Sequence, residues 1–137
     1  MLLIGADHRG FALKAYLIKT LSTQCTDIGC HSDKRCDFND VVKIMAESLN
    51  TFGVLICQTG LGMSICANRY KHIRAALCLN LDMTKLSREH LDANILIMPA
   101  KYIENNLALE MVKTFINTAP LGDPAYKIRL KKLMEGS

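Results

Sequence analysis

The sequence contains no tryptophan, and its aromatic side chains are limited to four tyrosines and four phenylalanines. Nucleic-acid-binding surfaces usually combine a basic face with aromatic side chains or carry a recognisable module. The formal net charge is only +4, and Lys127, Arg129, Lys131 and Lys132 near the carboxyl end supply that many positive charges without grouped aromatic residues. These features argue against a nucleic-acid partner. The basic cluster is therefore either a solvated helix face or a site for an anion.

The sequence also lacks any long apolar run. A helix that crosses a bilayer needs about 20 apolar residues, whereas the longest nearly unbroken runs here are 75–79 and 95–98. The first ten residues, MLLIGADHRG, reach an acidic residue at position 7 and have no basic lead, so they are unlike a signal peptide. We therefore expect a soluble, cytoplasmic protein with no membrane partner.

The six cysteines include no C-x-x-C pair, so zinc ribbons and thioredoxin-like motifs are unsupported. An even number of cysteines allows disulfides. However, Cys25, Cys57, Cys66 and Cys78 lie in or beside apolar segments, and a chain of 137 residues does not need cross-links to be stable. We therefore expect free thiols in a reducing compartment.

Apolar residues make up 50% of the chain, which is enough for a sizeable core and predicts a single domain over residues 1–137. Mainly aliphatic runs recur at five places and are separated by segments with helical spacing. The runs are 2–6, 25–29, 53–58, 73–78 and 94–98. This alternation predicts an α/β fold with a parallel sheet between two helical layers. Pro120, Gly122 and Pro124 then separate a short terminal helix over 125–134.

Ligands of open α/β sheets bind at the carboxyl ends of the strands. Polar residues follow two of the predicted strands at this position. Asp7 and His8 come directly after the first run, and a turn from Cys57 to Gly62 follows the third. Asp7 is either a helix cap or a ligand contact, whereas capping gives no role to His8.

The turn CQTGLG contains a thiol and two glycines, and a helix is predicted to begin near Met63. Gly60 and Gly62 allow unusual backbone angles, and the first amides of a helix attract a negative oxygen. The pattern is neither a Walker loop nor a dinucleotide fingerprint. Cys57 is either a buried small hydrophobe or a thiolate favoured by the helix start. A thiolate beside such a turn can remove a proton from carbon while the turn stabilises the resulting oxyanion.

Four stretches, GADHRGFALK, CQTGLGMSICANR, IRAALC and SREHLDAN, occur in this order and together resemble the type B ribose-5-phosphate isomerases and their relatives, including galactose-6-phosphate isomerase subunits. The resemblance extends over residues 2–132. It implies a three-layer α/β/α sandwich with a Rossmann-like, five-stranded parallel sheet and a C-terminal helix. It also implies a homodimer or tetramer with a shared active site that interconverts ribose 5-phosphate and ribulose 5-phosphate, in the pentose phosphate pathway, without metal or organic cofactor.

The resemblance implies a role for each matching residue. Cys57 matches the base that moves a proton between C1 and C2, and the turn from Thr59 to Gly62, including Gly60, would hold the enediolate oxygens. Asp7 matches a residue that contacts sugar hydroxyls, and His8 matches one near the phosphate.

Further matching residues lie in the second half of the chain. His90 matches the histidine that assists opening of the furanose ring from across the dimer interface. Lys101 falls where the family usually has an arginine that reaches the phosphate from the neighbouring chain. Arg129 matches an arginine of the terminal helix.

Some positions depart from the family pattern and would alter contacts to the periphery of the substrate. Leu91 replaces an asparagine, Gln58 replaces a glycine, and Phe38 keeps the ring of a usual tyrosine but lacks its hydroxyl. A second terminal arginine is missing, and Lys127 is its nearest substitute. The sequence therefore leaves open an isomerase of a six-carbon sugar phosphate, or a sugar-phosphate-binding module with reduced catalysis.

Overall fold

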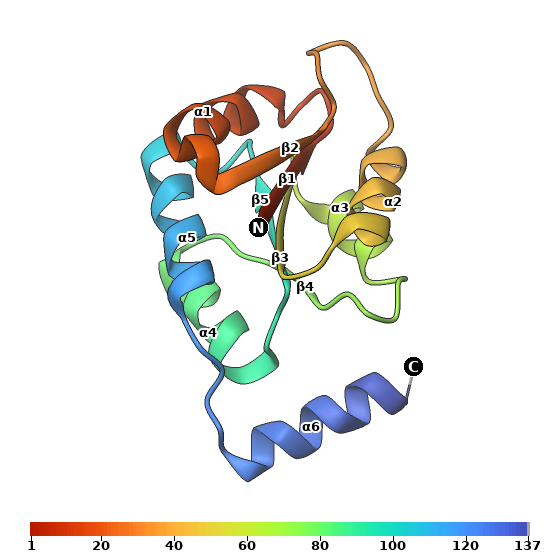
Figure 1. Ribbon diagram of the computed structural model, residues 1–137, viewed down its shortest axis with the longest axis vertical. Helices are drawn as coiled ribbons and strands as arrows, with labels where there is room; N and C mark the ends of the chain where they lie inside the picture. Colours follow the sequence, from red (N-terminus) through yellow and green to blue (C-terminus); the bar gives the residue numbers. More distant parts are fainter. Residues whose placement is uncertain (137) are drawn as a thin grey trace.

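The computed structural model describes residues 1–136, whose helices and strands are shown in Figure 1. The strands are β1 (Leu2–Ala6), β2 (Cys25–Gly29), β3 (Phe52–Cys57), β4 (Ala75–Leu77) and β5 (Ile95–Pro99). The α-helices are α1 (Phe11–Leu21), α2 (Phe38–Ser48), α3 (Leu61–Ala67), α4 (Leu81–Leu91), α5 (Asn105–Asn117) and α6 (Pro124–Glu135), and the 3-10 helix η1 (Ser22–Gln24) follows α1. Each run predicted as a strand overlaps one, although β3 begins one residue before its run and β5 ends one residue after its run. No helix within residues 1–136 has the length and apolar character needed to cross a membrane.

The strands of this region form one sheet in the order β2-β1-β3-β5-β4, and every pair of neighbours is parallel. Parallel neighbours require crossover connections, which here are mostly helices. Figure 1 shows α1, α4 and α5 on one side of the sheet and α2 and α3 on the other. The predicted three-layer α/β/α, Rossmann-like fold with a five-stranded parallel sheet is confirmed.

The central strand β3 is buried on both faces because its side chains alternate between two cores. Val54 and Ile56 pack in the core that includes α1 and α5, whereas Leu55 and Cys57 pack in the core that includes α2 and α3. Burial of each large apolar side chain contributes about 1.5–3 kcal/mol. The sheet therefore fixes the place of Cys57.

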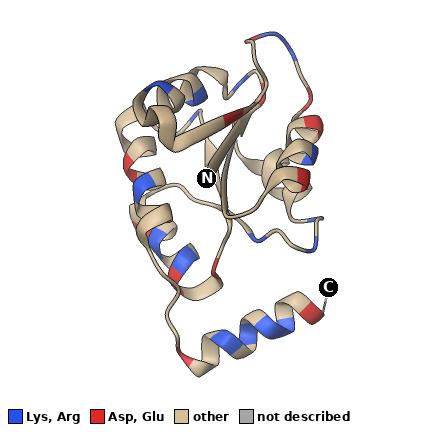
Figure 2. Ribbon diagram, viewed as in Figure 1, with Lys and Arg blue, Asp and Glu red and all other residues tan. Residues whose placement is uncertain are grey.

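The C-terminal helix α6 lies apart from the sheet (Figure 1). It begins at Pro124, one residue before the predicted start, because proline suits the first position of a helix. No residue of α6 is buried, and Ile128 and Leu133 are 55% and 50% exposed. Figure 2 shows that lysine and arginine also line this helix. It therefore presents both apolar side chains and positive charge.

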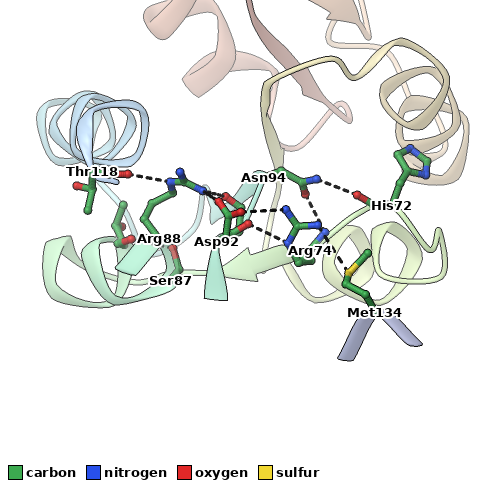
Figure 3. Close-up of polar contacts among 10 residues, drawn as sticks. His72, Arg74, Ser87, Arg88, Asp92, Asn94, Thr118 and Met134 are labelled. Carbon is green, nitrogen blue, oxygen red and sulfur yellow. Dashed lines mark hydrogen bonds and ion pairs between the residues drawn. The ribbon is translucent and has the colours of Figure 1, made fainter. Parts of the chain in front are cut away.

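Arg88 anchors the last turn of α4 to the neighbouring elements (Figure 3). Its side chain is almost fully buried, and Nη1 donates to Asp92 Oδ1 (2.7 Å) and to the carbonyl of Ala93 (2.6 Å). Nε donates to the carbonyl of Thr118 at 3.0 Å, after α5. The guanidinium also lies 4.7 Å from the ring centroid of Phe52. A buried cation with all of these partners stabilises the fold, whereas an unpaired one would not.

Arg74 extends this network toward β4 and α6 (Figure 3). Its Nε donates to the carbonyl of Asp92 at 2.9 Å, and its own amide donates to Asn94 Oδ1 at 2.8 Å. The Sδ atom of Met134 accepts from Arg74 Nη1 at 3.7 Å. The last of these contacts joins α6 to the start of β4.

The expectation that the cysteines are free thiols is wrong for two of them. Cys30 and Cys36 form a disulfide across the loop between β2 and α2, whereas Cys25, Cys57, Cys66 and Cys78 are free. The sequence places Cys30 and Cys36 six residues apart in a polar segment. Only the path of the loop, which the sequence does not reveal, brings their sulfur atoms together.

Candidate active site

Several predicted site residues gather where β1 and β3 end, and we call them the strand-end cluster. Its members are Asp7, His8, Cys57, Thr59 and Gly60. The two strands are paired through Ala6 and Ile56, and the amide of Asp7 donates to the carbonyl of Ile56 at 3.1 Å. The residues that follow β1 therefore lie beside those that follow β3, as the parallel topology predicted.

Cys57 ends β3 and is only 5% exposed. Its Sγ accepts a hydrogen bond from the amide of Gly60 at 3.2 Å. Gly60 has a φ of 76°, which side chains of L-amino acids disfavour, and the space beside its Cα is filled by Leu77. The turn therefore requires glycine at position 60 and holds the sulfur next to a main-chain donor.

The amides that follow this turn are partly occupied. Leu61 donates to Thr59 Oγ1 at 3.3 Å. The first amides of a helix have no acceptor within it, and within residues 1–136 the amides of Gly62 and Met63 make no hydrogen bond outside α3. The main-chain donor that the structure places at the Cys57 sulfur is the amide of Gly60.

Gly62 makes room for an aromatic ring. A Cβ atom at this position would lie 3.0 Å from ring atoms of Phe38, the first residue of α2. The sequence suggested that Gly62 serves ligand approach, but in the structure it also allows α2 and α3 to come close. Phe38 is thereby held beside the first turn of α3.

Asp7 is buried and caps the turn that precedes α1. Its Oδ1 accepts from the amides of Arg9 (2.9 Å) and Gly10 (3.0 Å). Asp7 thus bonds amides ahead of α1, but the N-cap of this helix is Gly10 and no side chain caps it. Oδ2 makes no hydrogen bond within residues 1–136, so the carboxylate keeps an acceptor for a ligand hydroxyl.

His8 is half-buried and lies against the loop that precedes α2. Its Nδ1 is 3.3 Å from both the amide nitrogen and the carbonyl oxygen of Cys36. Sequence reasoning missed Cys36 because this contact joins residues 28 positions apart. The interaction leaves Nε2 as the ring nitrogen that can face a ligand.

Two predicted residues, His90 on α4 and Arg129 on α6, lie with Tyr126 in a second group, which we call the helical cluster. The rings of His90 and Tyr126 are stacked, with centroids 4.4 Å apart and an interplanar angle of 17°. The guanidinium of Arg129 lies 5.7 Å from the centroid of Tyr126. Sequence reasoning missed Tyr126, although its spacing of three from Arg129 on a helix was a usable signal.

The helical cluster borders a cavity of about 460 Å³ that none of the strand-end cluster lines. Leu77 connects the two regions, because it lines this cavity and also packs on Gly60. Cys78 lies in the same wall. Burial raises the pKa of the Cys78 thiol, and hydrogen bonds with Ser87 and Thr84 partly oppose this effect.

The two predicted lysines lie in different regions. The amide of Lys101 donates to the carbonyl of Gln58 at 2.9 Å, so Lys101 lies next to the strand-end cluster. Lys127 lies exposed on α6 beside the helical cluster. Among residues 1–136, no group of three or more His, Cys, Asp or Glu side chains is arranged to hold a metal ion.

Comparison with known proteins places this geometry in context. Residues 2–133 match the sequence model of the Ribose/Galactose Isomerase family. The chain belongs to this family. The resemblance of the four sequence stretches to type B isomerases is thereby confirmed.

Relatives in the family are similar over nearly their whole length. A putative sugar phosphate isomerase of Rickettsia bellii is 37% identical, and the alignment covers 96% of each chain. The crystal structure of a ribose 5-phosphate isomerase from Thermotoga maritima has a TM-score of 0.93 and 40% identity, over 98% of this chain and 97% of that one. The Mycoplasma genitalium ribose-5-phosphate isomerase B, determined with bound ribulose-5-phosphate, has a TM-score of 0.87 and 27% identity, over 98% and 94%.

Proposed function

We propose that this chain is an aldose–ketose isomerase that interconverts ribose 5-phosphate and ribulose 5-phosphate. In this proposal Cys57 is the base that moves a proton between C1 and C2 through an enediolate. Residues 1–137 act as one sugar-phosphate isomerase domain in the cytoplasm. The family membership and the named activities of close structural relatives support the reaction.

The observation that supports the mechanism is the contact between the Cys57 sulfur and the main chain of the turn that follows β3. Sγ lies at the end of β3, 3.2 Å from the amide of Gly60 and beside further main-chain donors. A base next to such donors can take a proton from carbon while the amides stabilise charge that develops on the adjoining oxygens. Asp7 binds a sugar hydroxyl through its remaining oxygen, and Thr59, Gly60 and Gly62 bind the enediolate oxygens. Phe38 borders the sugar.

Two copies of the chain complete the site. Ring opening requires an acid, and we assign this role to His90. Because the cavity beside His90 excludes the strand-end cluster, His90 serves the site of a partner subunit. Exposed apolar side chains on α3 support such an interface, since Leu61 and Ile65 are 58% and 67% exposed. The resulting homodimer can itself pair into a tetramer.

The phosphate is bound by side chains from both regions. His8 contributes from the strand-end cluster, and Lys101 lies next to it. Arg129 and Lys127 contribute from α6, where positive charge is concentrated (Figure 2). Binding of this remote group supplies orientation for the reacting carbons.

A six-carbon sugar phosphate is the second candidate substrate. Leu91 lines the same cavity as His90 and is 48% exposed there, so it offers an apolar contact where the family has an asparagine. The leucine side chain cannot form a hydrogen bond with a five-carbon sugar, and it therefore favours a sugar of different chain length. Turnover of five-carbon and six-carbon aldose phosphates, compared in one assay, decides between the two.

The mechanism is tested with Cys57→Ala. We expect turnover to fall by about 10²- to 10⁴-fold, together with exchange of the substrate C2 proton with solvent, while the substrate still binds. The matched control is Cys66→Ala, which removes another free thiol in α3 and should keep activity. Unimpaired exchange in Cys57→Ala would reject the mechanism. Binding without exchange in the unmodified chain would instead identify a sugar-phosphate-binding module.

A further inference from the structure

The loop between β2 and α2 carries the disulfide, and in Figure 1 it arches above the sheet in orange. The Cys30–Cys36 bond closes a ring over this segment, which contains no helix or strand. Residues 31–35 are exposed. Within residues 31–35, the amide of Lys34 donates a hydrogen bond to Ser32 Oγ at 3.3 Å. The disulfide is therefore the main link across the loop.

Cys30 is fixed to the core. Its amide donates to the carbonyl of Ala6 at 2.7 Å, and its own carbonyl accepts from Lys14 Nζ. Lys14 is only 1% exposed and also donates to Asp27 Oδ1 at 2.7 Å. A buried ammonium with two good acceptors holds its partners firmly. Cys30 is thus a rigid support for whatever is bonded to its sulfur.

Cys36 holds His8 at the other end of the disulfide. Its amide nitrogen and its carbonyl oxygen are each 3.3 Å from His8 Nδ1. When Nδ1 accepts from the amide, the proton of the neutral imidazole is on Nε2. His8 then presents an N–H donor on its far side, which suits an anionic oxygen. The disulfide transmits the fixed position of Cys30 to this contact.

We propose that Cys30 and Cys36 form a redox-sensitive pair that positions His8 for the phosphate of the substrate, a role that rests on the function proposed above. In the disulfide form, Cys36 orients the imidazole. A dithiol reduces the bond: it delivers two electrons and two protons, the S–S bond becomes two thiols, and the dithiol closes to its own disulfide. Low-molecular-weight disulfides drive the reverse exchange. In a reducing compartment such a bond is transient and responsive.

Reduction frees residue 36 and weakens one oriented hydrogen bond to the phosphate. The affected step is binding and not proton transfer, because Cys57 is anchored by β3 and not by this loop. We expect the KM for ribose 5-phosphate to rise about threefold to tenfold, which corresponds to the loss of one hydrogen bond, with kcat within about twofold.

The experiment uses the full chain, held oxidised or reduced with dithiothreitol, with the state of Cys30 and Cys36 verified by alkylation and mass spectrometry. Steady-state kinetics give KM and kcat in each state. Cys30→Ser with Cys36→Ser should show the high KM in both states. The control Cys25→Ser, a free thiol at the start of β2, should respond to dithiothreitol like the unmodified chain.

Two further measurements separate a positioning role from a general loosening of the loop. In His8→Ala, dithiothreitol should no longer change KM. The ¹⁵N resonances of the His8 ring should differ between the oxidised and reduced unmodified chain, because the partner of Nδ1 changes. An unchanged KM with verified reduction, a full effect in His8→Ala, or identical His8 resonances would each overturn the proposal. Absence of turnover in both states would reject the proposed function, while the resonance comparison would still test the disulfide.

Discussion

The strand-end cluster and the helical cluster are built in opposite ways. Cys57 is placed by a central strand whose side chains are packed on both faces, and Asp7 is tied to that strand by a backbone hydrogen bond. His90 instead stacks on Tyr126 of α6, a helix without a buried residue. One half of the site is therefore fixed by the fold of a single chain. In the proposed dimer, the other half receives its final position from the interface.

The same contrast holds for two thiols at this edge of the sheet. Cys57 Sγ accepts a hydrogen bond from an amide, whereas Cys78 Sγ lies 3.7 Å from the carbonyl of Ala76, to which it donates. Burial raises the pKa of the Cys78 thiol. The Cys57 sulfur is held by a main-chain donor, whereas the Cys78 thiol donates to a main-chain carbonyl and also contacts Ser87 and Thr84.

The largest expected effect comes from mixing Cys57→Ala with His90→Ala. Each variant alone should lose about 10²-fold or more of its activity. If each site takes Cys57 from one subunit and His90 from the other, every mixed dimer contains one intact site. Co-refolded equal amounts should then recover about one quarter of the unmodified activity in a symmetric dimer.

Failure of the mixture to recover any activity, with mixed dimers verified by native mass spectrometry, would place both residues in the same subunit's site. The two clusters would then differ in how rigidly they are held, and not in which subunit supplies them.

A stability measurement on α4 comes next in size. Arg88→Met removes the buried cation that bonds the carbonyls of Ala93 and Thr118, so these acceptors lose their partner. We expect the free energy of unfolding to fall by about 3 kcal/mol, measured by urea denaturation at fixed protein concentration. Lys85→Met, at an exposed position of the same helix, should change it by less than about 0.5 kcal/mol. Equal effects would show that the network is not what holds the last turn of α4.

Gly60→Ala tests the strand-end cluster with a smaller change. Alanine at a φ of 76° is strained by about 1–2 kcal/mol, and its Cβ would meet Leu77. The turn must shift to accommodate the Cβ. We expect kcat to fall, because the amide of residue 60 moves away from the Cys57 sulfur. Gly122→Ala is the control because nothing lies within 4 Å of its added Cβ. If both variants keep full kcat, the turn does not set the position of the sulfur.

The smallest expected effect is on alkaline stability. The folded pKa of Cys78 is raised above its ordinary value of 9.0 by burial, so the unfolded chain loses this proton at lower pH than the folded chain. The associated stability is fully present below pH 9 and is lost as the pH rises through the folded pKa. Cys78→Ala should therefore lose stability less steeply than the unmodified chain between about pH 8 and pH 10. Urea unfolding of both chains at about pH 8 and at about pH 10 provides the test. An equal change in the free energy of unfolding between the two pH values would contradict the prediction.

The sequence was informative where periodicity and topology decide the structure. The apolar runs located each strand, and the rule that parallel strands end at one edge brought Asp7 and Cys57 together before any coordinates were considered. It was uninformative where a loop or a helix packs without periodic signals. The Cys30–Cys36 bond, the contact of Cys36 with His8 and the stacking of Tyr126 on His90 depend on paths that residue types do not encode locally. The roles of the site residues remain predictions.

The order of the strands has a consequence for how such a protein can change. After β1 the chain winds to one face of the sheet, and after β3 it winds to the other, so the two chain segments separate at the border of these strands regardless of which side chains line it. Side chains at this border can then be exchanged without displacing the strands. Under the proposed function, a lineage can retune the preferred sugar by substitutions outside β1 and β3, such as leucine at 91 or phenylalanine at 38, while the framework that presents the thiol stays untouched.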